Sequence, residues 1–297
     1  LIFTTLVFLL LRFPLEVLSW NGHSLLFDHY ELGIFSASAG WVDKPGLLYQ
    51  DFTSDYAIVT NLWFGFVKLI AVFAQKITGH TDDLFPLFFM LFGLWIWVLS
   101  GVYFWKRSGI KAWFWFTPAP LFFALNRFDT LPGLLVVGAA LTLSSGQFFL
   151  GAFLLGMSAA FKGYALFLAP ACFAYLLQKI SLKKALLTTS LVGLPMALFQ
   201  LGAVPFMGWE NMMKPIQFQS TRWLNGESIF DSLHALMTLT GFSTDTAVQV
   251  RDTLAVHRYS KGLQILGALS GFILWPKTRE QLLDTFLWVT LVFTTVG

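Results

Sequence analysis

Apolar residues occur along this chain in long uninterrupted runs that are separated by shorter polar stretches. The longest runs reach about 20 residues, which is the length a helix needs to cross about 30 Å of hydrocarbon. Because lipid offers the backbone no hydrogen-bond partners, such segments must be helical. The pattern predicts about nine or ten membrane helices, over residues 1–19, 57–77, 84–105, 112–125, 131–145, 148–161, 163–177, 185–206, 260–275 and 282–297.

Composition supports the same fold class. Hydrophobic residues make up 56% of the chain and charged residues only 12%, whereas soluble domains carry about 25% charged residues. So little charge is too little to cover a water-facing surface. We therefore expect an all-α, polytopic transmembrane helix bundle, with residues 1–297 forming a single integral membrane domain. Because the chain begins at Leu1 and ends at Gly297 within apolar runs, we expect a fragment.

Two polar stretches, 20–55 and 207–259, are too long to be simple turns, and long loops in compact proteins are usually functional or disordered. Both contain aromatic and apolar residues, so we expect ordered loops. Residues 30–39 predict a short interfacial helix in the first loop. The spacing of apolar residues over 227–239 predicts another helix in the second.

The short basic loops 106–111, 178–184 and 276–281 indicate the cytoplasmic side, because Lys and Arg are enriched there. Counting crossings from them places the polar regions on the external side: 20–55, 126–130, the surroundings of Lys162, and 207–259. One inconsistency remains, since two apolar runs separate the first external loop from the first basic loop. Either one of these two runs is re-entrant or interfacial, or one boundary is wrong.

Several kinds of site are excluded by the sequence. Cys172 is the single cysteine and lies in an apolar run, so an intramolecular disulfide or a cysteine-based metal site is excluded. His234 and His257 have no metal-ligand spacing. The chain contains no phosphate-binding loop and no Gly-x-Ser-x-Gly motif. The net charge of +3 reflects basic loops and does not indicate nucleic-acid binding.

Three acids of the first loop are candidates for chemistry. Asp28 follows the first apolar run and could act as a general base on a hydroxyl group; alternatively it is a solvated acid or a helix N-cap. Asp51 and Asp55 lie four positions apart where the run 57–77 begins. They either favour the positive end of that helix or bind a divalent cation or sugar hydroxyl groups.

The turn Asn126-Arg127-Phe128-Asp129 lies between two apolar runs. It is either a polar turn or a functional site, since charges near the membrane interior are costly. Lys162 separates two uncharged runs. It either extends its amine to the membrane surface or binds a phosphate group.

The large second loop contains Arg222 and Glu227, followed by Ser228. Arg can hold a phosphate group through two hydrogen bonds, and Glu227 could orient the helix that follows. The alternative is a structural Arg–Glu ion pair.

Taken in order, these motifs resemble a known family. Asp28 is followed by Leu48-Tyr-Gln-Asp-Phe52, Asp55-Tyr-Ala57, Asn126–Asp129, Gly151–Lys162 leading to Pro170, and Arg222-x4-Glu227-Ser228. The arrangement resembles the GT-C type polytopic glycosyltransferases, in particular the polyprenyl-phosphate-mannose-dependent mannosyltransferases of family 87 and, more distantly, the GPI-anchor mannosyltransferases. The motifs are short, and their order and membrane side carry the resemblance.

The resemblance implies an inverting glycosyltransferase at the external or lumenal face of a membrane, the bacterial cytoplasmic membrane rather than the endoplasmic reticulum. It would transfer a sugar, mannose in the first instance, from a polyprenyl-phosphate donor to a lipid, glycan or protein acceptor. By the same resemblance Asp28 is the catalytic base and Lys162 contacts the donor phosphate. Arg222 and Glu227 lie near the donor, and Asn126 and Asp129 form the external turn.

The sequence departs from this family at three places. Members often have Glu-Tyr-Pro-Pro where Asp55-Tyr-Ala-Ile58 stands, Gly-Gln-x-Asp at 126–129, and Arg-Gly at 222–223. These departures leave the subfamily and the sugar open, including arabinosyl or glucosyl transfer. Two other readings stay open: a polytopic transporter or lipid flippase, which would be expected to show inverted repeats, and a structural subunit without chemistry.

Overall fold

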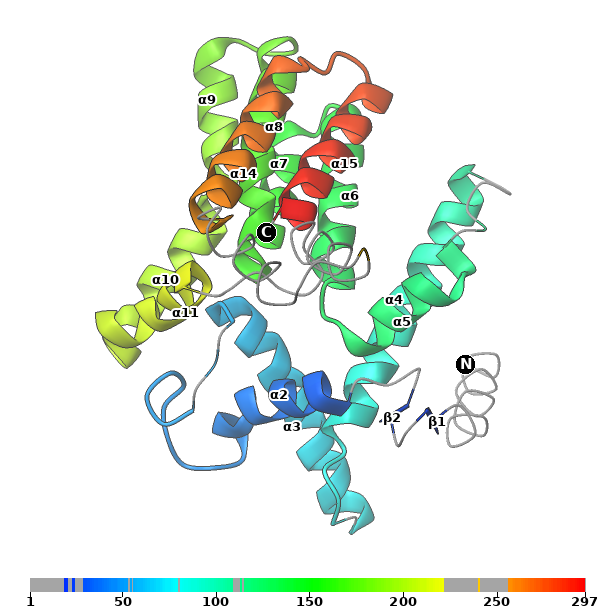
Figure 1. Ribbon diagram of the computed structural model, residues 1–297, viewed down its shortest axis with the longest axis vertical. Helices are drawn as coiled ribbons and strands as arrows, with labels where there is room; N and C mark the ends of the chain where they lie inside the picture. Colours follow the sequence, from blue (N-terminus) through cyan, green and yellow to red (C-terminus); the bar gives the residue numbers. More distant parts are fainter. Residues whose placement is uncertain are drawn as a thin grey trace. The chain divides into compact units, whose positions relative to one another are not determined.

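The computed structural model describes residues 19–20, 23–24, 29–52, 54, 56–79, 81–108, 113, 115–221, 240 and 256–296. Within these ranges the regular structure is helical (Figure 1). The exceptions there are an isolated bridge between Leu48 and Phe52 and two antiparallel two-residue strands, β1 (Ser19–Trp20) and β2 (His23–Ser24). The predicted all-α class is therefore confirmed at the level of helical structure.

The chain divides into two compact units. The first comprises residues 1–134 and 203–212, and the second comprises 135–202 and 213–297.

The first unit is built around aromatic side chains. Its helical elements are α2 (His29–Ser38), η1 (Gly40–Val42), α3 (Ile58–Thr78), α4 (Phe85–Ser108) and α5 (Pro118–Asn126). The ring of Phe35 in α2 lies in contact with those of Phe64, Phe89 and Phe128, at centroid distances of 4.8, 5.2 and 5.8 Å. Aromatic pairs at these separations add to the free energy of simple burial, so this cluster holds α2 against α3 and α4.

Helices α4 and α5 pack with very little space between their backbones. The indole N–H of Trp97 donates to the carbonyl oxygen of Trp115 at 2.9 Å. In return, the indole N–H of Trp115 donates to the carbonyl oxygen of Trp97 at 2.9 Å. Gly93 of α4 lies directly against the backbone of Ala124 in α5, where a Cβ atom would come within 1.8 Å of the carbonyl oxygen. A glycine is therefore required for this packing.

The second unit has a core of alanine and leucine side chains. Its complete helices are α7 (Phe148–Phe161), η3 (Gly163–Leu168), α8 (Ala169–Leu177), α9 (Leu182–Ser190), α14 (Val256–Ile273) and α15 (Arg279–Val296). Three further helices are shared with the first unit: α6 (Thr130–Ser144), α10 (Leu194–Met207) and α11 (Trp209–Thr221). The small residues let the helices approach closely. Where α8 and α14 pack, a Cβ on Gly271 would lie 3.0 Å from that of Ala171.

Helices α3 and α4 are each long and apolar enough to cross a membrane. The count of candidate spans among the described residues rises to four if the bent pairs α5–α6 and α9–α10 each form one span, with bends of 118° and 43°. Helix α7, the η3–α8 segment and the apolar part of α14 are shorter. These apolar helices support association with a membrane, while the predicted bundle of about nine or ten spans stays a prediction.

The helix of the first polar loop is confirmed, since residues 30–39 were predicted and α2 occupies His29–Ser38. The run 1–19 ends at the first described residue, and the helix predicted over 227–239 lies outside the described residues. In the second polar loop the structure adds α11, which the sequence pattern did not predict.

Candidate functional site

An ion pair in the first unit joins the first polar loop to the Asn126–Asp129 turn. Arg127 extends its guanidinium to the carboxylate of Glu31, with 2.5 Å between Nη1 and Oε1. Both side chains are largely buried, with 25% and 17% of their surfaces exposed. Glu31 lies in the first turn of α2, where a carboxylate is favoured by the helix dipole. Arg127 ends α5 with an extended backbone.

Asn126 and Asp129 flank this arginine and have different surroundings. Asn126 is fully buried, and its amide nitrogen donates to the carbonyl oxygen of Phe122 at 3.0 Å. Asp129 is half-buried, and its carbonyl oxygen accepts the N–H of Gly133 at 2.9 Å, in the first turn of α6. The turn is thus built into the bend between two helices.

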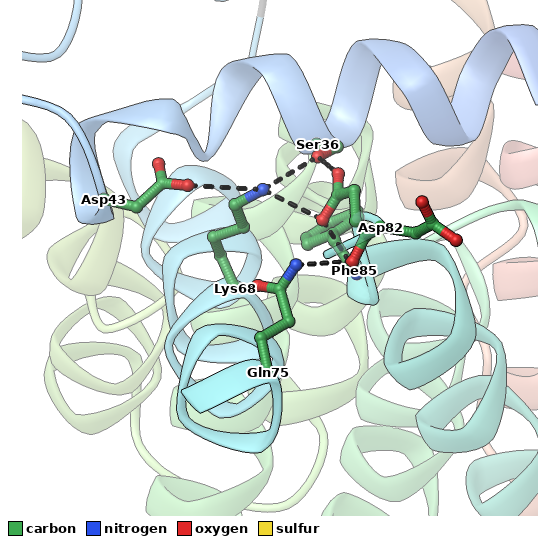
Figure 2. A network of polar contacts seen from close by, with 7 residues as sticks. Ser36, Asp43, Lys68, Gln75, Asp82 and Phe85 are labelled. Carbon is green, nitrogen blue, oxygen red and sulfur yellow. Dashed lines mark hydrogen bonds and ion pairs between the residues drawn. The ribbon is translucent and has the colours of Figure 1, made fainter. Parts of the chain in front are cut away.

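A second charged cluster surrounds Lys68, near the middle of α3 (Figure 2). Its ammonium nitrogen lies 3.0 Å from Oδ1 of Asp83, 3.3 Å from Oγ of Ser36 and 3.6 Å from Oδ2 of Asp43. Only 9% of the Lys68 side chain is exposed. One cation with two carboxylates thus ties together α2, the end of η1, α3 and the segment before α4. We call Ser36, Asp43, Lys68 and Asp83 the Lys68 cluster.

Asp83 is the most heavily hydrogen-bonded member of the Lys68 cluster. Its Oδ1 also accepts the N–H of Phe85 at 3.0 Å, and its Oδ2 accepts the hydroxyl of Ser36. Partial burial raises the pKa of the Asp83 carboxyl, but the hydrogen bonds from Ser36, Phe85 and Lys68, together with the Lys68 charge, hold that pKa below its usual range. Asp83 is therefore ionised at neutral pH.

A buried hydrogen-bond network lies around Tyr49, among the described residues of the first loop and the start of α3. The Tyr49 hydroxyl donates to the carbonyl oxygen of Tyr56 at 2.6 Å and accepts from the amide of Asn61 at 2.9 Å. Burial raises the pKa of Tyr49 well above its usual value, and the Asn61 hydrogen bond offsets only part of this. Asp51 is exposed, and its Oδ2 accepts the N–H of Leu47 at 2.8 Å. The Asp51 carboxylate therefore stabilises the turn over residues 47–51.

Lys162 belongs to the second unit, where it separates α7 from η3. It is exposed and has an extended backbone, with φ of −146°. Its N–H donates to the carbonyl oxygen of Ser158 at 2.9 Å, which caps the end of α7. The structure therefore places the lysine at a helix end with its side chain toward the surface.

Of the residues proposed from the sequence, Asp51, Asn126 and Asp129 lie in the first unit and Lys162 in the second. Asn126 and Asp129 share one turn. Asp28, Asp55, Arg222 and Glu227 lie outside the described residues. The described part of the chain holds no group of three or more His, Cys, Asp or Glu residues that could bind a metal ion.

Sequence reasoning missed the Lys68 cluster and the partner of Arg127. A signal existed, because a lysine within an apolar run that could span a membrane is a functional candidate in itself. Its partners could not be found in this way, since Asp43 and Ser36 are distant in the chain and are joined to it only by the fold.

Comparisons with protein families, with curated proteins and with solved structures found no match. The chain is a helical protein with apolar helices that could span a membrane and with largely buried ion pairs in its first unit.

Proposed function

We propose that this chain is a membrane glycosyltransferase of the GT-C type, a polytopic enzyme of the cell envelope. It moves a sugar, mannose in the first instance, from a polyprenyl-phosphate donor to a lipid, glycan or protein acceptor. The reaction takes place at the external face of the bacterial cytoplasmic membrane.

One observation carries the proposal beyond the sequence motifs. The Arg127–Glu31 ion pair joins α2 to the α5–α6 turn. Glu31 follows Asp28 by three positions in the chain. The ion pair therefore supports an arrangement in which the stretch next to the proposed base lies near the turn that contains Asn126 and Asp129.

The proposed reaction is a single inverting displacement. Asp28 removes the proton of the acceptor hydroxyl, whose oxygen attacks the anomeric carbon while the bond to the donor phosphate breaks. The departing phosphate gains negative charge, which Lys162 and Arg222 stabilise as cations. Asp51, Asp55, Asn126, Asp129 and Glu227 bind sugar hydroxyl groups or orient the donor.

The test is sugar transfer by the purified full chain in lipid vesicles. Polyprenyl-phosphate-linked radiolabelled mannose would be the donor and an alkyl mannoside the acceptor, with and without a chelator to test for a divalent cation. A positioned base contributes about 10²–10⁴-fold to a rate, so Asp28→Asn should reduce transfer by at least about 100-fold.

Glu280→Gln is the matched control, because Glu280 is an exposed acid in the first turn of α15, remote in sequence from every proposed site residue. It should leave transfer unchanged. If Asp28→Asn transfers sugar as the unmodified chain does, the base assignment is wrong. If the unmodified chain transfers no sugar from mannose, arabinose or glucose donors, the proposed function fails.

A lipid transporter or flippase is the second candidate, and the Lys68 cluster would favour it if α3 crosses the membrane. Ionisable residues in membrane helices often mark transport paths, and Lys68 lies in a helix long enough to span. Vesicles containing a fluorescent polyprenyl phosphate would distinguish the two functions. An impermeant reductant would bleach only the probe in the outer leaflet. If the chain makes the inner-leaflet probe accessible to the reductant and transfers no sugar, the transporter is favoured.

A further inference from the structure

Helix α4 begins beside the middle of α3 and not beside its end. Asp83, whose Oδ1 accepts the N–H of Phe85 in the first turn of α4, lies 3.0 Å from the ammonium nitrogen of Lys68. Helix α3 continues beyond Lys68 to Thr78. At 1.5 Å per residue, these last ten residues, 69–78, extend about 15 Å past the start of α4.

The chain returns along this projecting end of α3. The side-chain amide of Gln75 donates to the carbonyl oxygen of Asp82 at 2.5 Å (Figure 2). At the next residue, the ammonium group of Lys68 donates to Oδ1 of Asp83. Thr81, Asp82 and Asp83 are exposed and non-helical. Non-helical backbone facing lipid is not tolerated in hydrocarbon, because its polar groups would lack partners. The return segment, and with it the end of α3, must therefore lie outside the hydrocarbon core.

One face of α3 is nevertheless strongly apolar and uncovered. Five side chains at helical spacing are exposed to 42, 48, 58, 64 and 69%: Leu62, Phe66, Leu69, Phe73 and Ile77. We call these five residues the α3 stripe. The ring of Phe66 lies 5.7 Å from that of Phe92 in α4, so the α3 stripe adjoins a helix that can cross the membrane.

We propose that α3 does not cross the membrane and instead lies in its external interface, with the α3 stripe in contact with lipid. An interfacial helix presents one apolar face at the boundary of headgroups and acyl chains and keeps its other groups in water. The partner of the α3 stripe is then the lipid of the membrane that α4 crosses. The return segment stays in water on the same side as the first loop.

This arrangement also removes the inconsistency in the count of crossings. With α3 at the interface, α4 alone crosses between residues 55 and 106. The acidic first loop then lies on the external side and the basic loop 106–111 on the cytoplasmic side, as charge bias requires. The placement of α3 in the membrane does not depend on sugar transfer.

Cysteine labelling tests the side of the return segment. Gln50→Cys, Thr81→Cys and Lys106→Cys would be made singly in the full chain with Cys172→Ala; all three positions are exposed. A membrane-impermeant maleimide would be applied to sealed vesicles of each orientation. We expect Thr81→Cys to react from the same side as Gln50→Cys and from the side opposite to Lys106→Cys. Reaction of Thr81→Cys from the Lys106 side would show that α3 crosses, and would overturn the proposal.

Fluorescence quenching tests the lipid contact. A bimane attached to Phe73→Cys would be exposed to lipids brominated near the headgroup, to lipids brominated near the chain end, and to aqueous iodide, with Thr81→Cys as the water-exposed control. We expect headgroup-proximal bromine to quench the Phe73→Cys label most. Strongest quenching by chain-end bromine would show that α3 is embedded in the hydrocarbon, and would overturn the interfacial placement. Strongest quenching by iodide would show that the α3 stripe lies in water. Quenching by none of the three would show that protein covers the α3 stripe, and either of these last two results would overturn the lipid contact.

Discussion

Lys68 pairs with two carboxylates, those of Asp43 and Asp83. Removing it by Lys68→Met leaves Asp43 and Asp83 facing each other without their shared cation. Loss of one partner of a partly buried polar interaction costs about 1–3 kcal/mol, so we expect Lys68→Met to lower the melting temperature in detergent, followed by tryptophan fluorescence.

Lys76→Met provides the matched control for this prediction. Lys76 is an exposed lysine in the last turn of the same helix, and exposed substitutions usually change stability by less than about 0.5 kcal/mol. Equal melting temperatures for Lys68→Met and Lys76→Met would contradict a stabilising role for the Lys68 cluster.

Asp83 should make the stability of the first unit depend on pH. Its pKa is lower in the folded chain than the ordinary value of 3.8. Stability from this carboxylate is therefore present above that ordinary value and is lost as the pH falls through the lower, folded-state pKa. We expect the unmodified chain to melt above Asp83→Asn from pH 7 down to about pH 4, and the difference to shrink at lower pH.

The effect should be modest, because Asp83 is partly exposed and its ion pair is screened by solvent. Glu280→Gln serves as the control, since this acid is exposed. A difference between the unmodified chain and Asp83→Asn that stays constant below pH 4 would show that the Asp83 charge is not the cause.

At the scale of elements, the contact between α4 and α5 depends on Gly93. In Gly93→Ala the new methyl group would meet the carbonyl oxygen of Ala124 at 1.8 Å, so one helix backbone must shift. Overpacking of this kind costs about 1–3 kcal/mol or more, and we expect a clear fall in melting temperature.

Gly133→Ala is the matched substitution, because nothing lies within 4 Å of its Cβ position in α6. There, alanine is favoured over glycine by about 0.5–1 kcal/mol as a helix former. If Gly93→Ala melts at or above the temperature of Gly133→Ala, the two helices are not held in direct backbone contact.

Most of the described helices could be located from the sequence, because apolar run length is a strong local signal. The run 84–105 became α4 and the run 148–161 became α7. Run length carries no information about bends, so 185–206 appears as α9 and α10 with a 43° change of direction. It also misses polar helices: α11 carries Glu210 and Lys214 and contains Pro215 within it.

The site residues, too, divide into those with a local sequence signal and those without one. The Asn126–Asp129 turn could be found because its polar residues interrupt apolar runs. The contacts of Arg127 with Glu31 and of Lys68 with Asp43 and Asp83 could not be found, since each joins residues far apart in the chain. Which charged residues pair over such separations depends on how the helices pack. A single sequence shows which residues are apolar, but it does not show which helices pack together.

At the scale of the whole molecule, the basic loops predict the orientation of the chain in the membrane. In the second unit two of these loops touch, since the side-chain amide of Gln178 donates to the carbonyl oxygen of Pro276 at 2.9 Å. Loops in contact at helix ends must lie on the same side. We therefore expect Lys183→Cys and Lys277→Cys, both exposed positions, to react with an impermeant maleimide from one and the same side of sealed vesicles.

Lys106→Cys should react from that side too, because Lys and Arg gather on the cytoplasmic face. This requires an even number of crossings between residues 111 and 178. The 118° bend at residues 127–129 favours such a count, because a chain that turns so sharply heads back toward the side it came from, whereas the 43° bend between α9 and α10 lets the chain continue. Labelling of Lys183→Cys from the side opposite to Lys106→Cys would show an odd number of crossings and would contradict this prediction; if α5 and α6 together form a single broken span, Lys162 then lies on the other face.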